Sequence, residues 1–183
     1  MSLHTLKDVN SLNDPIKQFL IDFDIVLPAN TFNFKANQLE LRAQSFTFPS
    51  IQGDTTVVNW GGHERQFAGK QTRQGDWDVT FTEVWSGDVI DGFRKWMQKY
   101  HNYTNGTIAL RDEYMSTARV NLLNPDLYDP KPQGAVSKAI TLKQMYPTQV
   151  SVDGSIDPSS SKPVNIAVRF HYNYFLMADE KDA

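Results

Sequence analysis

The sequence predicts a mainly β domain with one flanking α-helix, and three observations on its 183 residues support that prediction. Apolar and polar residues alternate with a period of two in several segments bounded by glycine and proline, as in half-buried strands. Residues 88–100 form the only convincing run of apolar side chains at helical spacing. The composition, 40% apolar and 12% aromatic, suffices for a packed core. We expect one domain over residues 19–177, between an N-terminal extension (1–18) and a charged C-terminal tail (178–183).

The composition argues against several classes of function. The chain has no cysteine, which removes disulfides, thiolate nucleophiles and cysteine-bound zinc and fits folding in a reducing cytoplasm. The net charge is −3 and the basic residues are scattered, whereas proteins that grip nucleic acid carry a clustered basic excess. The N-terminal residues do not resemble a signal peptide, and no apolar run approaches the roughly 20 residues of a membrane span. We therefore expect no membrane anchor.

The first half of the chain predicts two strands followed by a ribbon. Residues 19–27 alternate and end at a proline, and residues 39–48 form a second strand whose middle is polar on both faces. The long stretch 53–75 is polar and contains the turn signal Gly61-Gly62. We interpret it as two extended strands with few side chains for a core. Because a two-stranded ribbon is not stable alone, it must pack on something, and another subunit is a candidate.

Residues 76–85 predict a strand with one buried face and one solvent-exposed face. The expected core face carries Trp77, Val79, Phe81 and Trp85. The expected polar face carries Asp76, Asp78, Thr80 and Thr82. The helix over residues 88–100 follows, with Ser86 or Asp88 as its expected cap. A lone amphipathic helix in a strand-rich chain usually covers an open end or face of the sheet.

The second half predicts three further strands. A possible strand at 118–123 precedes a proline-rich loop, and strand character returns at 139–145 until Tyr146-Pro147 breaks it. The last strand, residues 164–175, alternates without interruption. Its polar face carries Asn165, Arg169, His171 and Asn173.

No set of residues points to catalysis. Asp76 and Asp78 lie on the same side of one strand, so a pair of carboxylates for acid–base chemistry is conceivable. Two solvated residues on a polar sheet face are the more common explanation. The four histidines lack metal-binding spacing, and phosphate loops and nucleophile elbows are absent from the sequence. We expect no catalytic, cofactor-binding or metal site, and hence not an enzyme.

Several segments, in this order and at this spacing, resemble the tail tube protein family of contractile-tailed bacteriophages. They are LRAQSFTFPSIQG (41–53), FAGKQTRQGDWDVTFTEV (67–84), GFRKWMQ (92–98), MYPTQV (145–150) and NIAVRFHYNYFL (165–176). The resemblance covers about residues 19–177. The N-terminal extension and the proline-rich segment depart from it.

The resemblance implies an antiparallel β-sandwich or barrel-like subunit with a flanking helix. Strands of six subunits would be shared into one hexameric ring barrel, and the rings would stack into a tube inside a tail sheath. The implied setting is the tail of a virion, assembled in the host cytoplasm. Further implied partners are the baseplate, tail terminator and tape measure proteins, and phage DNA that crosses the lumen during genome ejection without specific binding.

Two hypotheses assign residues to this assembly. Asp76, Asp78, Thr80 and Thr82 would face the lumen. An inter-subunit hairpin would include Asn59, Trp60, Gly61, Gly62, His63, Arg65 and Phe67. The closed barrel would satisfy sheet edges that otherwise invite aggregation.

Alternatives remain open at the level of the sequence. A type VI secretion tube, another contractile injection tube or a baseplate tube initiator would share the architecture, and residues 1–18 could be the initiator's docking element. A carbohydrate-binding β-sandwich of a tail fibre could use Trp60, Trp77 or Trp85 as a stacking platform, although alternation makes the latter two core residues. A small glycosidase would depend on Asp76 and Asp78 alone.

Overall fold

A computed structural model describes residues 21–123, 136–152, 154, 159 and 161–178. The expected N-terminal extension (1–18) lies outside the described residues. The proline-rich segment and residues 179–183 of the expected tail lie outside them as well.

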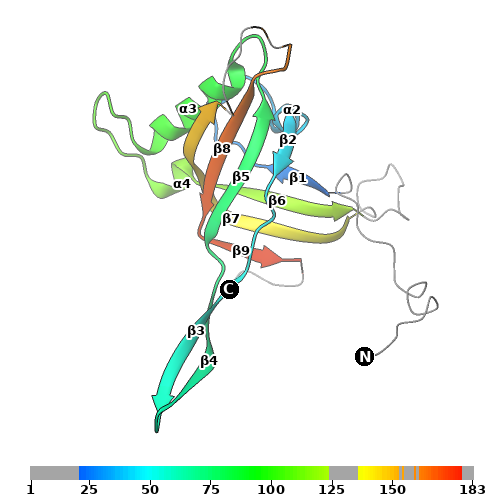
Figure 1. The fold of residues 1–183 in the computed structure, drawn as a ribbon. Coiled ribbons are helices and arrows are strands. Elements are labelled where there is room, and N and C mark those ends of the chain that lie inside the picture. The colour runs from blue at the N-terminus through cyan, green and yellow to red at the C-terminus, as the bar shows by residue number, and fades with distance from the viewer. Residues whose placement is uncertain (1–20, 124–135, 153, 155–158, 160, 179–183) are drawn as a thin grey trace, which may run out of the picture.

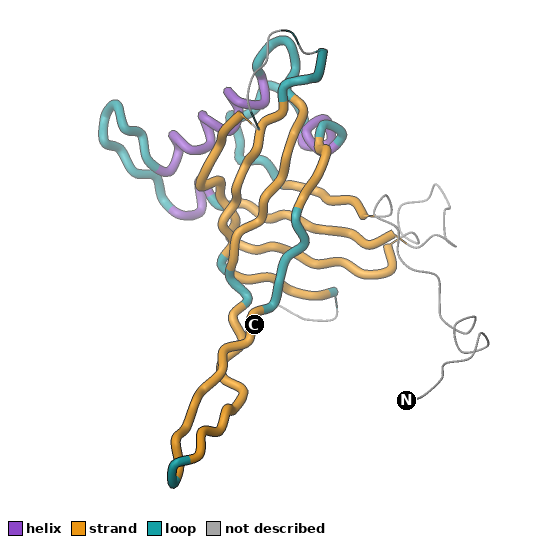
Figure 2. The backbone as a smooth tube through the Cα atoms, viewed as in Figure 1, coloured by secondary structure: helices purple, strands orange, loops and turns teal. Residues whose placement is uncertain are grey.

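The described part of the chain forms two antiparallel sheets joined through one long strand, β7, and a projecting hairpin (Figure 1). The first sheet contains β1 (Ile21–Ile25), β6 (Ser116–Leu123), β9 (Tyr174–Met177) and the start of β7 (Val136–Val152). The second contains β2 (Ala43–Phe46), β5 (Gly75–Thr82), β8 (Asn165–Tyr172) and the end of β7. The hairpin consists of β3 (Gln52–Trp60) and β4 (His63–Thr72). The helices are α2 (Ala36–Glu40), α3 (Asp88–Tyr100) and α4 (Arg111–Tyr114). Figure 2 shows how far strands outweigh helices, so the predicted mainly β, antiparallel fold class is confirmed.

Strand β7 runs through the Tyr146-Pro147 position at which the sequence predicted a break. Met145 pairs with β6 in the first sheet, and the next residue, Tyr146, already pairs with β8 in the second. Gln144 takes a positive φ of 56° just before this change of partner. The register shifts between Pro147 and Gln149. A proline is tolerated within a strand at such a bulge, because no ladder hydrogen bond is required of it there.

The predicted last strand is also divided, at Asn173, into β8 and β9. The Asn173 backbone N–H donates to the Lys143 carbonyl at 3.3 Å, and its side-chain amide donates to Gln144 Oε1 at 2.8 Å. The alternation shifts at this residue: Tyr172 and Phe175 are buried, whereas Tyr174 is only half-buried. The expectation of unbroken alternation was therefore wrong, and Asn173 is the corner at which the chain passes from the second sheet to the first.

The second predicted strand, residues 39–48, is correct only in its middle. Leu39 is fully buried but belongs to α2, and the strand itself is the short β2. Among the described strands, β2 pairs with β5 alone, and its register shifts between Ala43 and Ser45. A short, irregular edge strand accounts for a segment that is polar on both faces.

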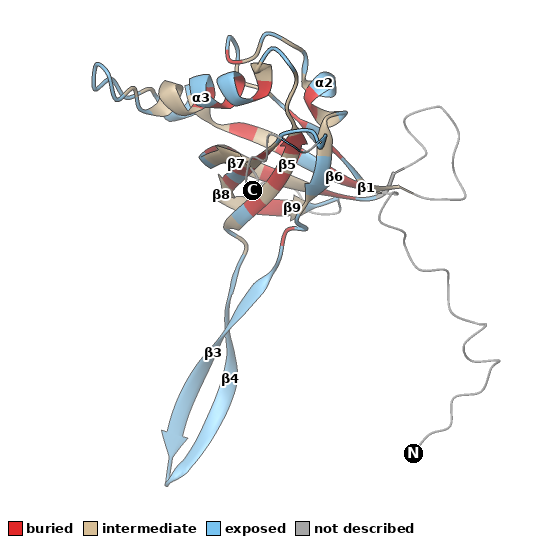
Figure 3. Cartoon of the chain, turned by 45° about the horizontal axis from the view of Figure 1, so that its top comes forward, coloured by how far each residue is buried: buried red, intermediate tan, exposed pale blue. Residues whose placement is uncertain are grey.

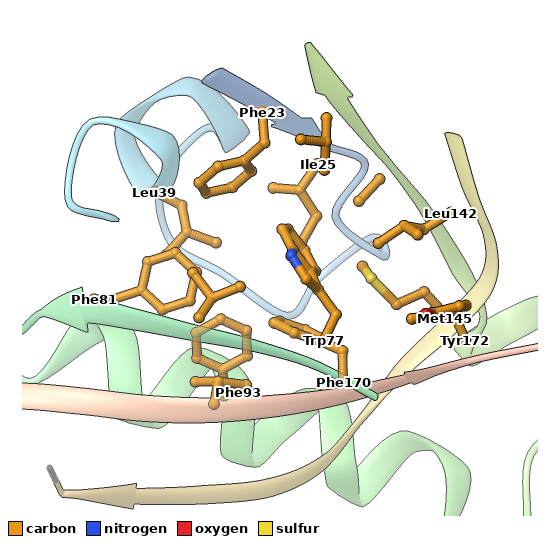
Figure 4. Packing of buried hydrophobic residues seen from close by; sticks show 14 of the residues in the cluster. Phe23, Ile25, Leu39, Trp77, Phe81, Phe93, Leu142, Met145, Phe170 and Tyr172 are labelled. Atoms are coloured by element: carbon orange, nitrogen blue, oxygen red, sulfur yellow. The ribbon is translucent and has the colours of Figure 1, made fainter. Parts of the chain in front are cut away.

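The core lies between the two sheets and under α3, which covers their open end (Figures 1 and 4). Helix α3 has the predicted bounds and buries Val89, Phe93 and Trp96. The Phe93 ring lies 5.4 Å from that of Phe81 and 5.7 Å from that of Phe170, so it ties the helix to the second sheet. Aromatic pairs of this kind add about 0.5–1.5 kcal/mol each beyond their buried area.

Two details around α3 differ from the prediction. Trp85 is fully exposed in the loop after β5, because the strand ends at Thr82 and the period-two alternation no longer applies. The N-cap position is Gly87, and neither Ser86 nor Asp88 caps the helix. The Glu83 carboxylate instead accepts hydrogen bonds from the Val89 and Ile90 N–H groups at 3.1 and 2.9 Å.

Candidate functional site

The first candidate surface is the polar face of the second sheet, on the side away from the core. Cross-strand pairing of β5 with β8 places Asp78 opposite Arg169, Asp76 opposite His171 and Thr80 opposite Ala167. The end of β7 adds Gln149 and Ser151 beside Arg169 and Ala167. Strand β2 contributes Gln44, whose amide donates to the Thr82 hydroxyl at 2.7 Å. The four residues predicted from β5 therefore do share one face, and they meet polar side chains from three other strands.

The charges on this face are paired. Arg169 Nε donates to Asp78 Oδ1 at 2.7 Å, and Arg169 Nη2 donates to Asp78 Oδ2 at 3.2 Å, which is a bidentate pair. The hydrogen bonds to Asp78 raise the pKa of Arg169, so the guanidinium stays charged. His171 Nδ1 lies 3.0 Å from Asp76 Oδ1. Both members of the Asp78–Arg169 pair are about half exposed, at 46% and 49%, so solvent screens the pair and it adds little to stability.

This arrangement does not resemble an acid–base site. Asp76 and Asp78 flank the buried Trp77 on one strand, and each carboxylate is engaged by its own cross-strand partner. The surface between β5, β8 and β7 is a shallow hollow of about 210 Å³ lined by Asp78, Thr80, Gln149, Ser151, Ala167 and Arg169. Within the described ranges, no group of three or more histidine, aspartate or glutamate residues could hold a metal ion. In the same part of the chain, every helix is too short or too polar to cross a membrane.

The second candidate surface is the β3–β4 hairpin, which extends away from both sheets (Figure 3). Every residue of its two strands is exposed. Gly61 and Gly62 both take positive φ, 58° and 82°, as the two central residues of a tight hairpin turn must, so the predicted turn is confirmed. An isolated two-stranded hairpin is marginal in water, which leaves this one in need of a surface to pack on.

The register of the hairpin gives its two faces different chemistry. Directly paired residues share a face, and the pairs Thr56–Phe67, Val58–Arg65 and Trp60–His63 lie on one side. We call Val58, Trp60 and Phe67 the apolar hairpin face. The opposite side carries the pairs Val57–Gln66 and Asn59–Glu64. The sequence predicted which residues form the hairpin but not which of them share a face.

The third feature is the pair of free edges of the second sheet. Within the described residues, β2 pairs only with β5, and residues 146–152 of β7 pair only with β8. The order β2-β5-β8-β7 is antiparallel throughout, so the two edge strands run in opposite directions. Unpaired edges present N–H and C=O groups that invite pairing with another chain.

Sequence reasoning missed the cross-strand partners. Arg169 and His171 were placed on the polar face of the last strand, but their pairing with Asp78 and Asp76 depends on a register that one sequence does not encode locally. The sequence did contain a partial indication of this pairing. The strand with Asp76 and Asp78 and the strand with Arg169 and His171 both alternate, and each pair is two residues apart. The capping role of Glu83 was missed because the carboxylate acts from the preceding loop, outside the usual cap positions.

Comparison with known proteins gave one family and several structures. The model of the family described as "Phage tail tube protein" matches residues 16–178. A chain in the cryo-EM structure of the anti-feeding prophage cap, a tube-terminating cap, is similar with a TM-score of 0.62 and 12% identity, covering 91% of this chain and 93% of that one. A chain in the sheath–tube complex of an extracellular contractile injection system is similar with a TM-score of 0.57 and 13% identity, covering 96% and 98%. A search among curated proteins found no match. At these identities, the structural matches establish a shared fold.

Proposed function

The chain belongs to the phage tail tube protein family, and from that premise we propose that six copies form a ring and that the rings stack into the inner tube of a contractile tail. Membership makes the chain a structural tube subunit. The family match over residues 16–178 is the observation that carries the proposal. The fold shared with chains of contractile injection particles supports the contractile setting.

The free edges of the second sheet support the closed ring. Edge β2 of one copy would pair with residues 146–152 of β7 in its neighbour. Because these edge strands run in opposite directions, the pairing between copies is antiparallel, like every pairing within the copy. Six copies would then close one barrel of uniform pairing with no edge left over.

The polar face supports the lumen assignment of Asp76, Asp78, Thr80 and Thr82. In a closed barrel the core side of the second sheet is covered by the first sheet and α3, which leaves the polar face for the channel. Because Arg169 is paired with Asp78, its guanidinium attracts DNA phosphates only weakly. DNA would cross such a channel without specific binding during genome ejection.

The β3–β4 hairpin is the proposed contact between copies, through the segment from Asn59 to Phe67. It contains the turn at Gly61 and Gly62, and it is exposed along its whole length in a single chain. Deleting Asn59–Phe67 should abolish tubes and leave a folded monomer. Long tubes from the deletion variant would contradict this role.

The remaining expectations follow from the same proposal. The outer surface would contact the tail sheath protein, and the ends of the tube would contact the baseplate, tape measure and tail terminator proteins. The subunit would act in the virion tail after assembly in the host cytoplasm, without catalysis and without a membrane anchor.

Negative-stain electron microscopy of the purified protein tests the tube directly. Rings or hollow tubes are expected, and a protein that stays monomeric at every concentration would refute the proposal. The lumen assignment can be tested with Thr80→Cys, because the chain has no other cysteine. In assembled tubes this thiol should react with a small maleimide and resist a protein-sized maleimide conjugate, whereas Lys95→Cys, exposed on α3, should react with both. Equal labelling by the large reagent would place Thr80 outside the lumen.

A second candidate is the tube of a contractile injection system that delivers protein. The similarity to the injection-system chain over 96% of this chain favours it as an alternative setting. Particles isolated from producing cells would distinguish the two: a tail attached to a DNA-filled head indicates a phage, and a headless particle with protein inside the tube indicates an injection system.

A further inference from the structure

Helix α3 and the end of β7 border an apolar groove. Ile90 and Met97 of the helix, Tyr103 of the following loop and Val150 of β7 line it, together with the polar side chains of Arg94, Gln98 and His101. The groove has a volume of about 430 Å³. Tyr103 is 69% exposed, although its hydroxyl is within hydrogen-bonding reach of the Arg94 guanidinium at 3.5 Å. Exposed apolar surface beside polar groups is typical of an interaction site.

The apolar hairpin face lies at the opposite end of the molecule. In Figures 1 and 3 the hairpin extends from one end of the sheets, and α3 covers the other end. Trp60 is 79% exposed and Phe67 53%, which are high values for large apolar side chains. Tryptophan is also among the residue types most enriched in the energetic centres of interfaces.

From these observations we infer that the apolar hairpin face of one copy docks in the α3 groove of the next copy along the tube. The inference rests on the proposed function and specifies the two surfaces that meet. Two different patches at opposite ends of a subunit make a head-to-tail contact, and such contacts repeat into open filaments instead of closing into dimers. The occupant is therefore a second copy of this chain.

The two sides of the hairpin are distinguished by what they could bury. Docking by the apolar side removes Val58, Trp60 and Phe67 from water, and each large apolar side chain contributes roughly 1.5–3 kcal/mol when fully buried. Arg65 and His63 lie on the same side and would stay hydrated at the edge of the contact. The other side offers one large apolar side chain, Val57, and would bury Gln66, Asn59 and Glu64, whose polar groups would each need a partner in the interface. Because three large apolar side chains lie on the Trp60 side and one on the other, the Trp60 side is the one that fits the groove.

Cross-linking between introduced cysteines tests this pairing, because the natural chain has none. A chain carrying both His63→Cys and Met97→Cys, assembled and treated with a short bismaleimide, should give a ladder of covalent oligomers on a denaturing gel; His63 pairs with Trp60 on the same side of the hairpin, so Trp60 itself stays in place. A mixture of the two single variants should stop at dimers. The matched control replaces His63→Cys by Gln66→Cys, on the other side of the same hairpin, and should cross-link at least about tenfold less.

The assembly threshold gives a second measurement. Trp60→Ala should raise the concentration needed for tube growth at least about tenfold, as expected for an interface centre, whereas Gln66→Ala should change it less than about threefold. Tubes that form normally without a cross-link between positions 63 and 97, or that cross-link equally well through position 66, would overturn the inference and leave the tube proposal standing. A wild-type protein that forms neither rings nor tubes would overturn both.

Discussion

Gly92 is a glycine in the middle of α3 that should not be replaced by alanine, although helix propensity alone favours the change. Alanine in an exposed helix interior is more favourable than glycine by about 1 kcal/mol. In this chain the ring of Phe32 lies directly against Gly92. A Cβ added at Gly92 would lie 2.1 Å from Phe32 Cδ1 and 2.2 Å from Cε1. Carbon atoms pack at about 3.5–4.0 Å, so the ring would have to move by more than an ångström.

The cost of that movement exceeds the gain in helix propensity. Forcing extra atoms into a packed site costs about 1–3 kcal/mol. If the Phe32 ring leaves instead, it gives up its edge contact with Phe93 and its tilted contact with Phe34, at 5.0 and 5.3 Å between ring centres, and each is worth about 0.5–1.5 kcal/mol in addition to the buried area. Offset by about 1 kcal/mol of helix propensity, Gly92→Ala should lower the free energy of unfolding by up to about 2 kcal/mol.

Urea unfolding followed by tryptophan fluorescence, at a concentration below that at which copies associate, measures this effect. The sharper test is a double-mutant cycle with Phe32→Ala, which removes the ring. In that background Gly92→Ala should stabilise the protein by up to about 1 kcal/mol, so the sign of the effect reverses and the coupling energy is about 1–3 kcal/mol. If Gly92→Ala is stabilising in the natural background, or has the same effect in both, the packing argument is wrong.

Two further predictions concern carboxylates. Glu83→Ala should lower the free energy of unfolding by about 1–2 kcal/mol in the same assay, because it removes the acceptor for two N–H groups at the start of α3. Ser86→Ala, the control, should lower it by less than about 0.5 kcal/mol. Equal losses from the two variants would refute the capping role of Glu83. Burial raises the pKa of Glu40 above its ordinary value of 4.5; the hydrogen bond from the Ile25 N–H opposes the rise, and the nearby carboxylates of Asp24 and Asp22 add to it. The folded protein therefore holds this proton more tightly than the unfolded chain does, and the contribution of Glu40 to stability is lost as the pH rises through the raised pKa. Measured as the difference between the two proteins, Glu40→Gln should be the more stable at neutral pH, with its advantage disappearing below pH 4.5. The opposite pH dependence of this difference would refute the assignment.

The parts of the fold that the sequence predicted best are those in which burial follows a regular period. Residues 76–82 alternate because one side of β5 lies in the core, and Val89, Phe93 and Trp96 recur because one side of α3 does. Within such elements the polarity of each residue indicates whether it faces the core or the solvent, so the sequence alone could place Asp76 and Asp78 on the solvent-exposed face of their strand.

The prediction failed where the chain changes partner. At Gln144 and Asn173 the polypeptide passes between the two sheets, and the alternation on either side belongs to different surfaces. Pro147 suggested a strand break because its missing N–H is costly in a regular ladder, but the bulge beside it removes that cost. Both features depend on contacts between segments far apart in sequence, and local periodicity does not contain them.

The pairings between candidate site residues were out of reach for the same reason. The sequence places Asp78 and Arg169 on polar faces, but only the register of β5 against β8 brings them together. The hairpin was predictable because its glycine turn is a local signal, whereas the common face of Trp60 and Phe67 follows from the count of residues around that turn.

The 17-residue strand β7 also has a mechanical consequence. This one continuous strand belongs to both sheets, because it is hydrogen-bonded to β6 in the first sheet and to β8 in the second. Sliding one sheet over the other would therefore require breaking either ladder or stretching the chain between Met145 and Tyr146. A load applied to the first sheet therefore reaches the second through the covalent backbone of β7, as well as through the packing between the sheets.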